Sequence, residues 1–163
     1  GPYGAATPDA PGSTVQGAKD VNHRLIARYT ISPAWIVQGT WDRAEYGVDG
    51  IAAGAMDNYR RDAWSALLIH RRGAHHGWLN YGRAADGRCT FAGGGNCVTR
   101  GVGATSWAAG YRYDFSRRTD IFVSYYRVNN RDSGQYGPFP RATAGIAPGA
   151  RQSGVTLGIE HAF

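Results

Sequence analysis

The sequence has no long apolar segment. No run of about eighteen apolar residues occurs anywhere in its 163 residues, and this excludes a transmembrane helix. It does not exclude a membrane protein built from strands. A barrel strand needs only about ten residues and presents every second side chain to lipid, so the mean hydropathy of a membrane barrel stays low.

Lysine and cysteine are both scarce. Lys19 is the only lysine, so the formal net charge of +6 comes almost entirely from arginine. The two cysteines, Cys89 and Cys97, enclose seven residues of a glycine-rich stretch with no histidine nearby in sequence. In a chain destined for an oxidising compartment, this spacing favours a local disulfide over free thiols or a metal site.

The usual catalytic arrangements are missing as well. The sequence contains no phosphate-binding loop, no Ser-His-Asp spacing and no pair of carboxylates in a plausible register. We therefore predict that the protein is not an enzyme and needs no cofactor. The arginines are spread along the whole chain instead of clustering on one predicted face, which argues against a nucleic-acid partner.

Strict alternation is clearest in the last stretch of the sequence, residues 152–163. Val155, Leu157 and Ile159 fall on one face of an extended strand, whereas small or polar residues fall on the other. The stretch ends on Phe163. An outward-facing phenylalanine at this place is typical of the aromatic girdle that marks the membrane boundary of a β-barrel.

Similar alternation predicts an all-β fold, a transmembrane antiparallel β-barrel of about seven strands. The predicted strands are residues 20–30, 35–46, 60–71, 77–84, 103–114, 119–130 and 152–163. Residues 1–19 are predicted to form a loop within a single barrel unit covering 1–163. The predicted connections are short turns at 31–34, 72–76 and 115–118 and long loops at 47–58, 85–101 and 131–151. Short connections at one rim and long connections at the other are expected when one rim of a barrel faces the periplasm. This arrangement is not expected of a soluble β-sandwich.

The second half of the chain resembles a known family. The matching segments are SWAAGYRYDFSRRTDIFVSYYRV at 106–128, APGARQ at 147–152 and GVTLGIEHAF at 154–163. They resemble the C-terminal end of the trimeric general-diffusion porins of Gram-negative beta-proteobacteria. The resemblance is dense over 105–163 and weakens back to about Val21.

The porin resemblance implies an outer-membrane channel for the passive diffusion of small hydrophilic solutes. It also implies a homotrimer in contact with lipid and lipopolysaccharide, and a barrel of about sixteen strands. Seven strands alone would leave two unpaired edges in lipid, so we expect the missing N-terminal strands to come from the same porin or another chain. The alternative is a non-conducting barrel with a structural or adhesive role.

Three arginines are predicted to line the channel: Arg24, Arg28 and Arg112. An arginine on the lipid face at mid-membrane costs about 2–4 kcal/mol, so an interior position is favoured. Guanidinium groups on a narrow wall would concentrate small anions, which agrees with the anion selectivity common in the resembled family. The alternative is that these arginines only solvate the wall and pair with acids such as Asp42 and Asp114.

Aromatic residues are predicted to form the membrane girdle. The predicted girdle consists of Trp35, Trp107, Tyr111, Tyr113 and Phe163. By analogy with residues 106–111, the outward side chains of the third strand are expected to be Trp64, Ala66 and Leu68. His75 and His76 are expected to be exposed turn residues and not a metal site.

Overall fold

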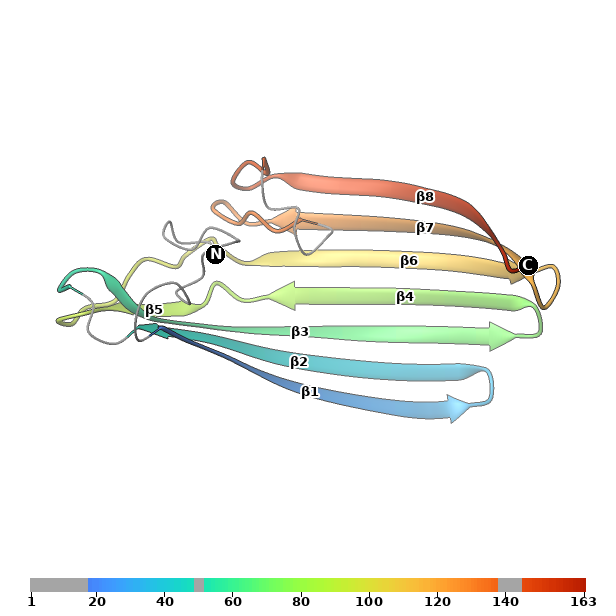
Figure 1. The fold of residues 1–163 in the computed structure, drawn as a ribbon, viewed down its shortest axis with the longest axis horizontal. Helices are drawn as coiled ribbons and strands as arrows, with labels where there is room; N and C mark the ends of the chain where they lie inside the picture. The colour runs from blue at the N-terminus through green and yellow to red at the C-terminus, as the bar shows by residue number, and fades with distance from the viewer. Residues whose placement is uncertain (1–17, 49–51, 138–144) are drawn as a thin grey trace.

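The computed structural model describes residues 18–48, 52–137 and 145–163. This part of the chain forms one antiparallel sheet and contains no helix (Figure 1). The strands are β1 (Ala18–Ser32), β2 (Trp35–Val48), β3 (Met56–Arg72), β4 (His75–Ala84), β5 (Arg88–Phe91), β6 (Ala104–Asp114), β7 (Thr119–Asn130) and β8 (Arg151–His161). The all-β, antiparallel part of the predicted fold is therefore confirmed.

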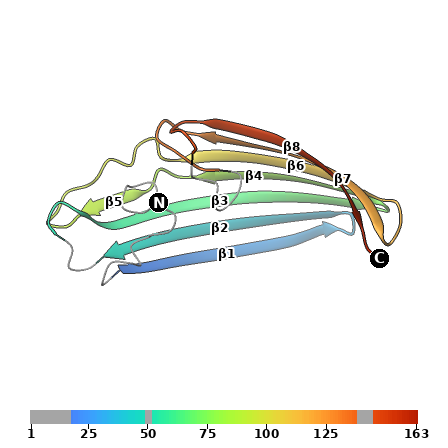
Figure 2. The same ribbon diagram turned by 45° about the horizontal axis from the view of Figure 1, so that its top comes forward.

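Seven long strands follow one another across the sheet in the order β1-β2-β3-β4-β6-β7-β8. Each pairs with its neighbour in the chain, as expected when antiparallel strands are joined by direct connections. The sheet is not closed, because β1 and β8 stand at its two edges. Figure 2 shows that the long strands bend together into a curved sheet.

The eighth strand, β5, was not predicted, because residues 85–101 were expected to form only a loop. Strand β3 begins at Met56, four residues before its predicted start, and its first residues extend beyond the end of β4 at Ala84. Strand β5 supplies the missing partner there and pairs with residues 56–60 of β3. A four-residue strand is too short for alternation to reveal it.

The connections are sorted by length, as predicted. The β1–β2, β3–β4 and β6–β7 turns all lie at one end of the sheet, which we call the short-turn end (Figure 1). Gly73 in the β3–β4 turn has a φ of 58°, a conformation that glycine adopts without steric cost. The longer connections lie at the opposite end, the long-loop end.

The sheet has almost no buried core among its described residues. The buried apolar side chains are Ile36, Tyr59, Cys89, Val102, Ala104 and Val128. Many large apolar side chains are instead exposed, for example Leu157 at 72% and Leu25 at 66%. The described residues alone therefore leave much of the apolar surface of this single curved layer uncovered.

Candidate functional site

The strand register divides the sheet into two faces of opposite character. Residues that stand opposite one another in the register share a face, and the face changes with every residue along a strand. We call one of them the apolar face; its members include Leu25, Val37, Trp64, Leu68, Leu79, Trp107, Val123 and Leu157. The other is the polar face; its members include Arg24, Thr40, Ser65, Asn80, Ser106, Arg112, Ser124 and Thr156.

Ring-bearing side chains form two bands on the apolar face. On four neighbouring strands they recur at a spacing of six residues, about 20 Å along a strand. The pairs are Trp35 and Trp41 on β2, Trp64 and His70 on β3, His75 and Tyr81 on β4, and Trp107 and Tyr113 on β6. Within each band, rings from neighbouring strands touch, with centroids 4.6 Å apart for Tyr81 and Trp107 and 5.0 Å apart for His75 and Tyr113.

The residues predicted for the membrane girdle fall in or beside these bands. Trp35, Trp107, Tyr111 and Tyr113 all lie on the apolar face. Phe163 follows the end of β8, and its ring lies 5.0 Å from that of His161. The register also confirms that Trp64, Ala66 and Leu68 share the apolar face. Their position at a membrane boundary stays a prediction.

Glycines on the polar face make room for aromatic rings from the preceding strand. The ring of Tyr126 on β7 lies where a side chain of Gly154 on β8 would be, because a Cβ atom there would meet it at 2.6 Å. Phe122 lies over Gly158, and Trp78 of β4 lies over Gly110 of β6, in the same way. These rings therefore lie against the next strand of the sheet.

Two of the arginines predicted to line a channel lie on β1. Arg24 and Arg28 share the polar face, about 13 Å apart along the strand. Arg24 donates a hydrogen bond from Nε to Asp42 on β2 at 2.5 Å. Arg28 stands opposite Gln38 and forms no ion pair with any described residue. Arg24 is thus neutralised, whereas the charge of Arg28 is unpaired within the described part of the chain.

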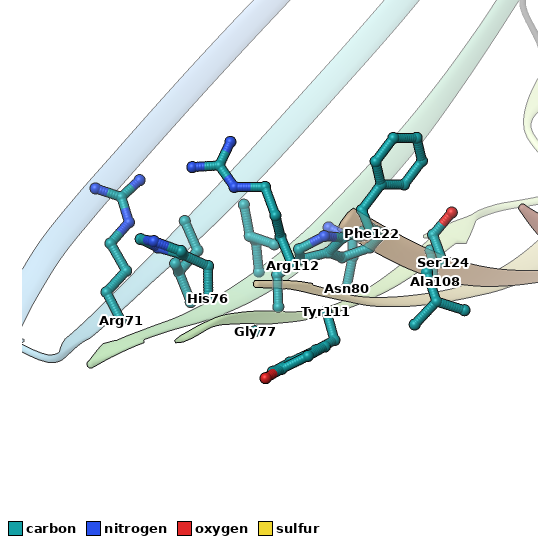
Figure 3. A pocket seen from close by; sticks show the side chains of 13 residues that line it. Arg71, His76, Gly77, Asn80, Ala108, Tyr111, Arg112, Phe122 and Ser124 are labelled. Carbon is teal, nitrogen blue, oxygen red and sulfur yellow. The ribbon is translucent and has the colours of Figure 1, made fainter. Parts of the chain in front are cut away.

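The third predicted arginine belongs to a row of basic groups. Arg71, His76 and Arg112 stand opposite one another on β3, β4 and β6. Figure 3 shows these three side chains on the same side of the sheet, with Tyr111 pointing the other way. Asp114 lies close to both neighbours: its Oδ1 forms an ion pair with Nε of Arg112 at 3.0 Å, and its Oδ2 is hydrogen-bonded to Nε2 of His76 at 2.8 Å.

The sequence predicts neither Arg71 nor His76 as a site residue: Arg71 is the last residue of the predicted strand 60–71, and His76 lies in the β3–β4 turn predicted at 72–76. The turn consists only of Gly73 and Ala74, so the prediction that His75 and His76 lie in a turn is wrong. Both belong to β4, and their side chains lie on opposite faces, so they cannot chelate one ion. No group of His, Cys, Asp and Glu suited to a metal occurs among the described residues.

A hollow of about 850 Å³ lies above the basic row on the polar face. Its charged and polar lining comes from Arg71, His76, Arg112, Asn80 and Ser124. Its apolar lining comes mainly from Leu67, Ile69, Trp78 and Phe122. The hollow lies toward the short-turn end, because Arg71 and Arg112 are one and two residues from the ends of their strands.

The β7–β8 connection covers part of the polar face at the long-loop end. The hydroxyl of Tyr136 accepts a hydrogen bond from Arg61 of β3, and the Arg61 guanidinium lies 5.0 Å from the Tyr136 ring centre. Asn130 fixes the backbone of Tyr136 through two hydrogen bonds of 2.7 and 2.9 Å. Strands β4 and β6 separate β3 from β7, so the connection reaches across the sheet. Burial raises the pKa of the Tyr136 phenol, and the nearby Arg61 charge offsets this only in part.

A second contact ties the same connection to the β4–β5 segment. Arg131 donates to Oδ2 of Asp86 at 2.9 Å, and the backbone N–H of Gly103 donates to Oδ1 of Asp86 at 2.8 Å. The backbone N–H of Arg131 in turn donates to the Gly103 carbonyl at 2.9 Å. Charge pairing and backbone bonds therefore hold residues 131–137 over the polar face.

The predicted disulfide between Cys89 and Cys97 is confirmed. The two sulfur atoms are bonded, and the Cα atoms are 5.3 Å apart, within the usual range for a disulfide. The Cys97 backbone N–H also donates to the Cys89 carbonyl at 3.1 Å. The bond ties β5 to the segment that follows it, where Thr90 also forms a β-bridge with Asn96.

Comparison with known protein families, with curated proteins and with solved structures found no match for this chain. None of the described residues belongs to a helix long and apolar enough to cross a membrane. The features that bear on function are therefore the two faces of the sheet and the charged and polar groups of the polar face.

Proposed function

We propose that this chain forms part of the wall of a porin-type channel in the outer membrane of a Gram-negative bacterium. Small hydrophilic solutes would diffuse through it passively, with a preference for anions and without catalysis. The observation that carries the proposal is the sheet itself, with an exposed apolar face bounded by ring-bearing residues and an opposite face of polar groups and glycines. Such a layer is expected between lipid and water.

The height of the apolar face supports a membrane position. On the apolar face of β3, a charged residue bounds the apolar stretch at each end. These residues are Asp62 and Arg72, which are ten residues apart. This is about 34 Å along the strand, and a strand tilt of about 40° reduces it to about 26 Å. The apolar band of outer-membrane barrels is about 25 Å tall, so the two dimensions agree.

The open edges of the sheet imply additional strands. Strands β1 and β8 each leave one row of backbone N–H and C=O groups without a strand partner among the described residues. In lipid each unsatisfied group costs several kcal/mol, so both edges need partners. We propose that strands from the rest of the same porin, or from another chain, close a barrel of about sixteen strands, which assembles as a trimer like the porins that the sequence resembles.

The preference for anions depends on where charge lies along the wall. The acids Asp114, Asp120 and Glu160 share one row at the short-turn end, whereas Arg28 lies further inside and has no acidic partner among the described residues. In a confined lumen with low-dielectric walls, a free guanidinium raises the local concentration of anions. Arg28 and Arg71, which form no ion pair with any described residue, are therefore the groups that favour anions most, whereas Arg112 is partly balanced by Asp114.

Conductance of the intact protein in planar bilayers tests the proposal. We expect stepwise channels and a reversal potential in a salt gradient that indicates anion preference. Replacing Arg24, Arg28 and Arg112 together by Gln should move the reversal potential toward cations while the channels persist. An unchanged reversal potential would mean that these arginines only solvate the wall.

The second candidate function is a non-conducting barrel with a structural or adhesive role. One observation favours it: residues 131–137 lie over the polar face and are held there by Arg61 and Asp86. Folded, membrane-inserted protein without conductance would support this candidate and contradict a channel. Contact with lipid and lipopolysaccharide is expected in both cases.

A further inference from the structure

We propose that the hollow above Arg71, His76 and Arg112 is a binding site for small organic anions that combine a carboxylate with an apolar or aromatic body. The inference rests on the proposed function in one respect, because it takes the polar face to be open to water. It goes further by assigning one place on the wall and one class of ligand.

The cationic half of the site comes from two arginines on either side of His76. Directly opposed residues on neighbouring strands have Cβ atoms about 5 Å apart, so Arg71 and Arg112 start about 10 Å apart. Figure 3 shows both guanidinium groups extending away from the sheet on the same side. A carboxylate placed between them can accept charge-assisted hydrogen bonds from both.

Both arginines keep donors for a ligand. Arg71 makes no side-chain hydrogen bond or ion pair with any described residue. Arg112 uses Nε for Asp114 at 3.0 Å, and its two terminal nitrogens have no partner within the described ranges. Asp114 also lies 2.8 Å from Nε2 of His76, so this carboxylate is shared by Arg112 and His76, whereas Arg71 has no acidic partner among the described residues.

The apolar half of the site comes from Trp78 and Phe122. Both rings lie over glycines of the next strand, Gly110 and Gly158, and this keeps them close to the sheet. Together with Leu67 and Ile69 they form an apolar floor beside the basic row. The volume of about 850 Å³ falls within the usual range for small-molecule sites, and their typical lining is apolar with a few polar anchors.

Fluorine NMR of the intact, detergent-solubilised protein tests this site with three probes. 4-Fluorobenzoate carries both a carboxylate and an aromatic ring. Fluoroacetate carries only the carboxylate, and 4-fluorobenzyl alcohol carries only the ring. We expect 4-fluorobenzoate to bind about ten-fold more tightly than either of the others. Equal affinity for 4-fluorobenzoate and 4-fluorobenzyl alcohol would overturn the proposal.

Substitutions of the two arginines test whether the ligand binds in the hollow. Arg71→Gln and Arg112→Gln should each weaken 4-fluorobenzoate binding several-fold, and the double variant should weaken it about ten-fold or more. Arg72→Gln is the matched control, because Arg72 is the next residue but lies on the apolar face; its affinity should stay within about two-fold of the parent. Arg71→Lys, which keeps the charge, tests the site if a Gln variant does not fold.

The result separates this inference from the proposed function. Anion-selective channels whose 4-fluorobenzoate affinity is unaffected by the Arg71 and Arg112 changes would overturn the inference alone. Binding that depends on Arg71 and Arg112 in a protein without conductance would support the inference and contradict the channel. Far-UV circular dichroism of each variant shows whether it retains the strand content of the parent, so that a loss of affinity can be distinguished from unfolding.

Discussion

Nε of Arg24 lies 2.5 Å from Oδ1 of Asp42 on the neighbouring strand, and this pair divides the arginines of the polar face into two kinds. Arg24 is already balanced by a carboxylate. Arg28, on the same strand and the same face, has only the neutral Gln38 opposite it. The two residues look alike in the sequence, but the register gives them different electrostatic roles.

The first prediction follows from this difference. In the intact protein, Arg28→Gln should move the reversal potential toward cations, whereas the double variant Arg24→Gln/Asp42→Asn should leave it nearly unchanged, because the double variant removes a neutral pair. Asp42→Asn should move it toward anions. Measurements at about 0.1 M salt are the most sensitive, since the Debye length there is about 10 Å. An effect of the double variant as large as that of Arg28→Gln would contradict these roles.

The glycines under the aromatic rings should be sensitive to a single methyl group. Gly154→Ala places a Cβ atom 2.6 Å from the Tyr126 ring and should cost about 1–3 kcal/mol of stability. Gly39→Ala is the control, because nothing lies within 4 Å of its Cβ position and alanine should be neutral or slightly stabilising. Urea unfolding of both variants measures the difference. Equal stabilities would show that Tyr126 does not lie against Gly154.

Adjacent residues of β4 should respond oppositely to a new charge. Leu79 lies on the apolar face and Asn80 on the polar face. If the apolar face contacts lipid, Leu79→Arg should destabilise the folded, membrane-inserted protein by about 2–4 kcal/mol. Asn80→Arg should be tolerated. Urea-dependent folding into phospholipid vesicles measures both, and equal tolerance of the two arginines would contradict a lipid-facing surface.

The Tyr136 contact should make the long-loop end sensitive to alkaline pH. Burial raises the pKa of this phenol above its ordinary value, so the folded protein retains the proton more strongly than the unfolded chain. Its contribution to stability is therefore present below about pH 10 and is lost as the pH rises through the folded pKa. Phenolate absorbance should show one late-titrating tyrosine that disappears in Tyr136→Phe. Identical titration curves would refute the buried position.

The strands could be predicted from the sequence where apolar and polar residues alternate along them. Residues 152–163 alternate most clearly, whereas 119–130 also carries Phe122, Tyr126 and Val128 on the polar face; the observed β7 and β8 agree with the predicted ranges to within two residues. The same pattern placed Arg24, Arg28 and Arg112 on one face before any pairing was known. Local alternation is sufficient for this, since a one-residue shift would reverse every side chain.

The features that were missed depend on contacts between distant residues or on very short elements. Strand β5 has four residues, and it exists because β3 extends past β4 and needs a partner. Because the β3–β4 turn is only two residues long, His76 belongs to β4 and stands in the basic row. The Arg61–Tyr136 contact joins residues 75 positions apart, which no local pattern can reveal.

Neighbouring alanines on β6 allow the most direct test of the central claim that one face of this sheet lines a water-filled channel and the other contacts lipid. Ala108 lies on the polar face and Ala109 on the apolar face. The measurement is single-channel conductance of the intact protein carrying Ala108→Cys or Ala109→Cys, before and after addition of a negatively charged, membrane-impermeant thiosulfonate. We expect the reagent to lower the current and weaken anion preference in Ala108→Cys and to leave Ala109→Cys unchanged. Equal responses of the two variants, or a response of Ala109→Cys alone, would contradict the assignment of the faces and with it the channel.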